Sequence, residues 1–123
     1  MEPKSLIKKK LARHSKSKFR SSFSLNQKDK NYIKEKGLLK IEKHALDFLN
    51  SRIKIKPGND TKQTPFRGHP VFKAQHATGI CCRKCIQKWN KIPKEKTLEV
   101  KEIEYLKEVL MAWIKKEIKK QYR

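Results

Sequence analysis

The chain has 123 residues, and 33 basic against 12 acidic side chains give it a formal net charge of +21. This length allows one small domain, and the charge makes polyanions, nucleic acid first, the default partners through counterion release. No run of residues approaches the ~20 apolar positions that cross a bilayer, and no secretory signal follows the basic start. We therefore expect a soluble, cytoplasmic protein without a membrane span.

Residues 1–22 form a basic, serine-rich arm with little apolar surface to bury. We predict that this arm is disordered and that residues 23–123 form a single helical domain. The side chains of the arm best suited to phosphate contacts are Lys8, Lys9, Lys10 and Arg13. Lysine outnumbers arginine 27 to 6, and reading base sequence favours arginine, so the expected nucleic-acid affinity is non-specific.

Helical periodicity begins near Asn26, and Gly37 is suited to the left-handed position that ends a helix. A second helix follows, with apolar residues spaced by three, four and seven. These residues are Leu38, Ile41, Ala45, Leu46, Leu49 and Ile53. His44 lies beside this stripe and is interpreted as a histidine at the boundary of the core, hydrogen-bonded within its own turn or to a carboxylate.

Residues 56–70 are predicted to form an ordered polar loop, because turn residues and two prolines interrupt any helix there. Lys62 and Arg67 of this loop would present positive charge beside a site. Residues 71–74 fit either a short strand or extended chain, and residues 80–91 fit a short helix that Pro93 ends.

The last predicted helix begins after Thr97, as N-cap, and runs to about Lys120. Its buried stripe is Ile103, Leu106, Leu110, Trp113, Ile114 and Ile118. The opposite face carries lysines, among them Lys116 and Lys119, which are either solvated or in contact with phosphates. The fold class is therefore mainly α: a small single-domain helical fold with an ordered polar loop, a Cys/His site and a basic N-terminal arm.

All three cysteines and two of the four histidines lie between Gly68 and Cys85, inside a central Cys/His segment at 57–93. Thiolates and imidazoles are the ligands that zinc prefers, and Cys82 and Cys85 form a familiar C-x-x-C pair. We predict a Zn²⁺ site with ligands drawn from His69, His76, Cys81, Cys82 and Cys85. An iron–sulfur cluster is disfavoured, because the chain has three cysteines and not four.

Two other interpretations of the same segment remain open. A cysteine at a helix N-terminus beside Arg83 and Lys84 could be a reactive thiol, or the cysteines could simply pack in the core. An enzyme is the alternative to a structural zinc site, either a metal-dependent nuclease or a Cys/His hydrolase. Its candidate catalytic residues are His69, His76, Asp60 and Arg67.

The central block resembles a known family. It consists of residues 59–72 (NDTKQTPFRGHPVF), residues 74–78 (AQHAT), the CCRxC run at 81–85, Trp89 and residues 92–94 (IPK). This block resembles the small microbial and phage family DUF4186, a domain of unknown function, over about residues 18–118. The resemblance implies one compact domain with a shared central site and no assigned activity.

The chain departs from that family pattern at two positions. Asn90 stands where relatives carry a histidine after the tryptophan, and Glu95 stands where a glycine is usual. If that histidine were a metal ligand, this chain would lack it. The metal prediction therefore rests on His69, His76 and the cysteines.

Overall fold

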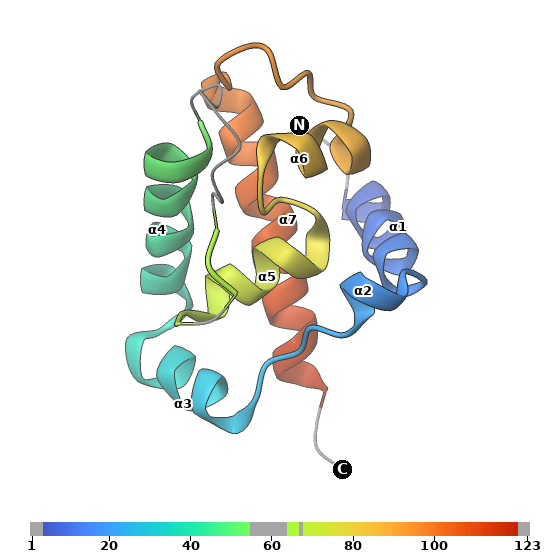
Figure 1. Ribbon diagram of the computed structural model, residues 1–123. Coiled ribbons are helices and arrows are strands. Elements are labelled where there is room, and N and C mark those ends of the chain that lie inside the picture. The colour runs from blue at the N-terminus through green and yellow to red at the C-terminus, as the bar shows by residue number, and fades with distance from the viewer. Residues whose placement is uncertain (1–3, 55–63, 67, 121–123) are drawn as a thin grey trace.

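The computed structural model describes residues 4–54, 64–66 and 68–120, and the described residues are mainly helical without a strand (Figure 1). The mainly-α prediction is thus confirmed. In chain order the elements are α1 (Lys4–Ser15), α2 (Lys18–Ser21), α3 (Gln27–Lys36), α4 (Leu38–Phe48), the π-helical turn η1 (Leu49–Ile53), α5 (Pro70–Thr78), α6 (Arg83–Asn90) and α7 (Val100–Lys119). Among the described helices, none combines the length and the apolar character needed to cross a membrane.

Helix α7 is the centre of the fold, and α1, α4 and α5 pack around it (Figure 1). Its predicted stripe is buried from Ile103 to Ile114, while Ile118 packs against the core from a half-buried position. The helix begins with a capping box of Glu99 and Glu102 and not at Thr97. The buried side chain of Lys107 donates to Glu42 at 2.6 Å and thereby ties α7 to α4.

The structure differs from the predicted disordered arm, because residues 4–21 form α1 and α2. Ile7 and Leu11 lie one turn apart and are each only 6 % exposed, since they pack into the core beside α7. These two apolar residues, spaced by four among lysines, give the arm a narrow apolar stripe. A short stripe of this kind becomes a stable helix only through tertiary packing.

Residues 70–78 form α5 and not the strand or extended chain that we expected for 71–74. Pro70 occupies the first helical turn, where its missing N–H costs nothing, and the His69 side chain caps the helix by accepting from the Val71 N–H. Gly79 ends α5 with φ of 73°, and a Cβ there would lie 2.8 Å from the Trp89 ring. This glycine therefore lets Trp89, in the last turn of α6, lie against the end of α5.

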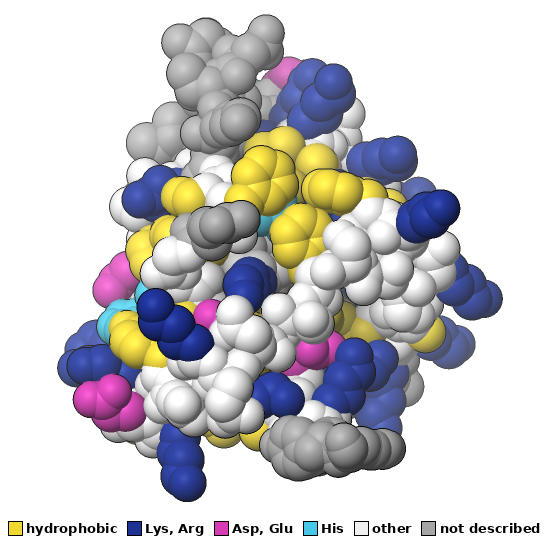
Figure 2. Space-filling model, turned by 60° about the horizontal axis from the view of Figure 1, so that its bottom comes forward, with side chains coloured by type: hydrophobic (Ala, Val, Ile, Leu, Met, Phe, Trp, Pro, Cys, Tyr) yellow, Lys and Arg dark blue, Asp and Glu magenta, His cyan; other side chains and the backbone are white. Residues whose placement is uncertain are grey.

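Basic side chains spread over the surface, and hydrophobic side chains also gather near the centre of one face (Figure 2). The exposed large hydrophobic residues include Phe19 and Phe66, which lie close to the cysteine segment in the fold. Exposed hydrophobic side chains gathered on one face are unusual for a chain with a mean hydropathy of −0.91.

Candidate metal centre

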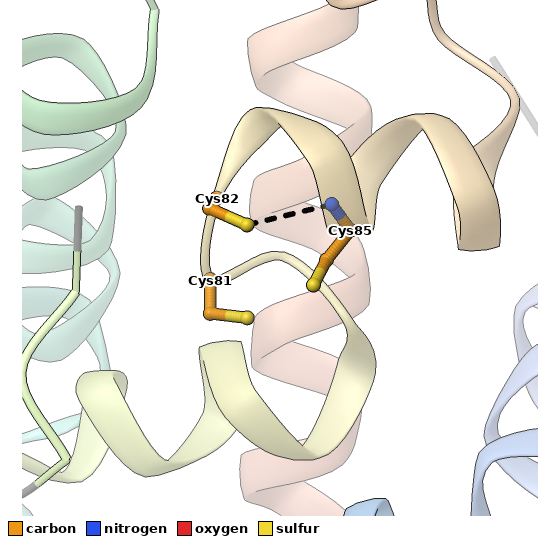
Figure 3. A group of neighbouring side chains, drawn as sticks. All are labelled: Cys81, Cys82 and Cys85. Carbon is orange, nitrogen blue, oxygen red and sulfur yellow. Dashed lines mark hydrogen bonds between the residues drawn. The ribbon is translucent and has the colours of Figure 1, made fainter. Parts of the chain in front are cut away.

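The three cysteines lie where the chain turns from α5 into α6. Cys82 is the N-cap of α6, with extended backbone (φ −162°), and its Sγ accepts from the Cys85 N–H at 3.5 Å. Cys81 precedes it, and Cys85 lies in the first turn of the helix. Figure 3 shows the three sulfurs pointing into the same space between the two helices.

The sulfur atoms of Cys81, Cys82 and Cys85 all lie within 4.8 Å of one another. Zinc–thiolate bonds of about 2.3 Å in a tetrahedron place neighbouring sulfurs about 3.8 Å apart. Small side-chain adjustments would therefore bring all three sulfurs onto one ion. Cys81 is 8 % exposed, and Cys82 and Cys85 are half-buried, so the cluster is largely shielded from solvent and could hold a metal ion.

Arg20 reaches the cysteines from α2, although it is 61 residues from Cys81 in the sequence. Its Nη1 donates to the backbone carbonyl of His76 at 2.7 Å and to Cys81 Sγ at 3.6 Å, and its Nη2 donates to Cys85 Sγ at 3.2 Å. The side chain is 7 % exposed. Burial opposes its charge, but the hydrogen bonds and attraction from the two cysteines raise the pKa of Arg20 above its ordinary value.

Hydrogen bonds within the cluster favour one thiolate. The thiols of Cys81 and Cys85, and then the backbone N–H groups of Cys85 and Lys84, lower the pKa of Cys82 against the effect of burial. The same contacts to Cys82 and Cys85, together with burial, raise the pKa of Cys81. The cluster therefore favours the thiolate at Cys82 over the thiolate at Cys81, in keeping with the place of Cys82 at the positive end of α6.

A second layer of buried polar groups fixes the cysteine segment. Thr64 donates from Oγ1 to the Cys81 carbonyl at 2.6 Å, and Gln75 donates from Nε2 to the Ile80 carbonyl at 3.1 Å. Arg83 is fully buried and donates to the carbonyls of Lys54 at 3.1 Å and Pro93 at 2.8 Å. These bonds set the backbone from which the cysteines project, the kind of support that orients metal ligands.

His69 does not join the cysteines, although we predicted it as a ligand or catalytic residue. It caps the start of α5, and the cysteines follow the end of this nine-residue helix, about 13 Å away along its axis. Its Nδ1 accepts from the Val71 N–H, and its Nε2 lies 3.0 Å from Nδ1 of His44. Burial and the neighbouring His44, partly offset by Asp29, lower the pKa of His69 to about 4.

His76 lies nearer to the cysteines, in the last turn of α5, but outside their mutual 4.8 Å cluster. Its Nε2 lies 3.2 Å from the Thr64 carbonyl and 3.1 Å from the Pro65 carbonyl, so this nitrogen carries the hydrogen. Burial lowers the pKa of His76, and the two carbonyl contacts oppose that shift. The ring stacks on Phe66 with 4.3 Å between centroids.

The remaining predicted residues are dispersed. Asp60, Lys62 and Arg67 lie outside the described residues. Lys8, Lys9 and Arg13 are exposed on α1, Lys10 donates to Asn90 Oδ1 at 3.3 Å, and Lys116 and Lys119 are exposed on α7. Sequence reasoning missed Arg20 and Thr64 as partners of the cysteines. The presence of Arg20 in the resembling segment was the one signal for it.

The described fold and cluster define a small, mainly helical protein with three cysteines arranged as candidate metal ligands. A family model matches residues 8–115, and the chain belongs to that family, DUF4186, a domain of unknown function. The match confirms the resemblance found in the central block and includes all three cysteines and Arg20. No solved structure matches the chain.

Proposed function

We propose that this protein binds one zinc ion through Cys81, Cys82 and Cys85 and holds nucleic acid without sequence preference. The observation that carries the first half is the convergence of the three sulfur atoms within 4.8 Å. Soft thiolates select zinc and other thiophilic metals over hard cations. The short sulfur–sulfur separations suit a single ion better than a cluster, whose bridging sulfides hold its cysteines further apart.

Charge balance supports a thiolate-bound ion. Three thiolates and one Zn²⁺ carry a net charge of −1, and the buried guanidinium of Arg20 lies against two of the sulfurs. Its N–H groups would offset that charge and donate to the thiolates once they ionise on metal binding. Without a thiolate or another anion, a buried arginine at this position would be costly.

The number of ligands bears on the enzyme alternative. Zinc in a structural site takes four protein ligands, whereas a catalytic zinc keeps one position for water or substrate. Among the described residues three ligands converge, which favours an open site as the second candidate function: a metal-dependent hydrolase. His76 is then the candidate acid–base residue, because it lies nearer the cysteines than His69, the other predicted catalytic side chain that the structure describes.

The nucleic-acid half rests on a groove between α1 and α7. Some lysines that we predicted as phosphate contacts on the N-terminal arm and on the last helix line the same groove. This groove has a volume of about 580 Å³. The lysines are Lys8, Lys116 and Lys119, joined by Lys115. Ile7, Leu11 and Met111 form its apolar floor, and Glu108 is the acidic residue that lines it. Four ammonium groups along one groove suit a phosphate backbone.

Cobalt substitution tests the metal half. Protein loaded with Co²⁺ should show strong near-ultraviolet thiolate-to-cobalt absorption. The intensity of this absorption should fall in each of the single variants Cys81→Ser, Cys82→Ser and Cys85→Ser. His69→Ala is the control, because its ring lies at the far end of α5, and it should leave the spectrum unchanged. A spectrum insensitive to all three cysteine variants would contradict the proposed ligands.

Salt dependence tests the nucleic-acid half. The affinity for DNA should fall steeply between about 50 and 200 mM salt, and a variant with glutamine at Lys8, Lys116 and Lys119 should reduce the slope of log K against log salt by about 3. Lys34 and Lys40, exposed on α3 and α4, supply the control substitutions. Affinity that does not change with salt would contradict this half.

A further inference from the structure

Three phenylalanines form an exposed aromatic patch beside the candidate metal centre. Phe19, on α2, is 52 % exposed, and Phe66 is 47 % exposed, while Phe23 is half-buried between them and the core. The rings of Phe23 and Phe66 are nearly parallel, with 6.3 Å between centroids and 6° between planes. Phe19 meets Phe23 edge to face at 5.2 Å.

The buried ring of His76 supports the aromatic patch. The imidazole of His76, 6 % exposed, stacks on Phe66 at 4.3 Å and on Phe23 at 5.3 Å. Its contacts with the Thr64 and Pro65 carbonyls hold that ring in place. The aromatic surface is therefore preorganised, and a flat ligand that stacks on it would order few side chains.

Positive charge lies directly beside the rings. The guanidinium of Arg20 lies 4.9 Å from the Phe19 ring centroid. A small cavity of about 70 Å³ is lined by Arg20, Phe23, Lys116 and the Lys120–Glu117 ion pair, and Lys116 also lines the lysine groove between α1 and α7. This cavity therefore links Phe23 of the aromatic patch to the lysine groove.

From this link we infer that the protein binds single-stranded nucleic acid, with unstacked bases on Phe19 and Phe66 and the phosphate backbone along the lysine groove. The inference rests on the nucleic-acid half of the proposed function and specifies its ligand. Aromatic platforms beside a basic groove bind single strands, because every base has a face that can stack. In a duplex those faces are already stacked on neighbouring bases, so the patch discriminates against duplex.

The test is a fluorescence-anisotropy titration of the full chain with labelled oligothymidylate of about 12 nucleotides, a length within the range that single-strand sites cover. The same titration uses a duplex of equal length and an oligonucleotide of abasic residues, which keeps the phosphates and lacks the bases. Wild-type protein should bind oligothymidylate at least about tenfold more tightly than either comparison ligand.

Phe19→Ala and Phe66→Ala should each weaken oligothymidylate binding about tenfold and leave the affinity for the abasic strand unchanged. Phe19→Tyr, which keeps a stacking ring, should restore binding. Leu39→Ala is the matched control, since Leu39 is 82 % exposed on α4, away from the patch, and this variant should bind as wild type. Circular dichroism of each variant checks that the fold is retained.

The two proposals fail in different ways. Steep salt dependence with equal affinity for all three ligands, unchanged by the phenylalanine variants, would overturn the single-strand inference and leave the nucleic-acid half of the proposed function standing. Absence of binding to any of the ligands at low salt would overturn both. If Phe66→Ala changed the oligomeric state without loss of oligothymidylate affinity, the aromatic patch would be a contact between copies of the chain. That result would overturn the inference.

Discussion

The cysteine cluster and the His44–His69 pair lie at opposite ends of α5, and they use their donor atoms in opposite ways. At the cysteines, the partners Arg20 and the Cys85 N–H donate hydrogen bonds to sulfur, which favours thiolates. At the histidines, Nδ1 of His69 accepts from Val71, so its Nε2 carries the hydrogen and donates to Nδ1 of His44. The Nδ1 atoms of His69 and His44 are therefore both already accepting hydrogen bonds. One end of α5 is suited to a metal, and the other is suited to capping a helix.

Arg83 supports the backbone at the cysteine end of α5, and its replacement should have a large effect on stability. Arg83→Met keeps an aliphatic stem but removes the buried guanidinium that donates to the carbonyls of Lys54 and Pro93. We expect a loss of about 3 kcal/mol in the free energy of unfolding, because hydrogen bonds from a charged donor are each worth about 1.5–3 kcal/mol. Urea denaturation of the metal-free protein measures it. Arg52→Met, at an exposed position on η1, is the control, and an equal loss in both variants would contradict the role of Arg83.

A buried histidine outside both regions provides the next effect. Burial first, and then the charges of Arg13, Arg20 and Lys10, lower the pKa of His14 to about 4. The unfolded chain, with an ordinary histidine pKa near 6.5, binds more protons than the folded chain between these values, so stability rises with pH there. Acidification from about pH 6.5 to 4 should therefore cost up to about 3 kcal/mol from this group.

His14→Leu isolates that contribution. The variant should be less sensitive to pH than wild type across this window, measured by urea denaturation at pH 7 and pH 5. His14 is 3 % exposed and lies against Trp89 at 4.8 Å, so leucine fits an apolar setting. Identical pH dependence in the two proteins would show that His14 does not titrate on unfolding in this range.

A smaller effect tests the histidine end directly. His69→Ala removes the side chain that caps α5 and should cost about 1 kcal/mol. His69→Asn restores a good capping acceptor and should recover part of that loss, while both variants lose the same imidazole packing against Phe48. Thermal unfolding measures the difference between them. Equal stability of the alanine and asparagine variants would contradict the capping role.

The parts of the structure that follow from local pattern were predictable. The stripes of α4 and α7 repeat at helical spacing, and the close approach of Cys81, Cys82 and Cys85 follows from adjacent positions at the start of one helix. The identity of α5 was missed because Val71 and Phe72 favour strands locally, whereas Pro70 and the His69 cap act together to start a helix. Arg20 was missed because its contact spans 61 residues, which no spacing rule covers.

The metal content of the protein distinguishes the cysteine cluster from the histidine end of α5. Untagged wild-type protein, Cys82→Ser and His69→Ala would be dialysed side by side and measured by inductively coupled plasma mass spectrometry. We expect roughly one zinc per chain in wild type and His69→Ala and a large loss in Cys82→Ser. Folded wild-type protein without zinc, or zinc lost in His69→Ala and retained in Cys82→Ser, would contradict it.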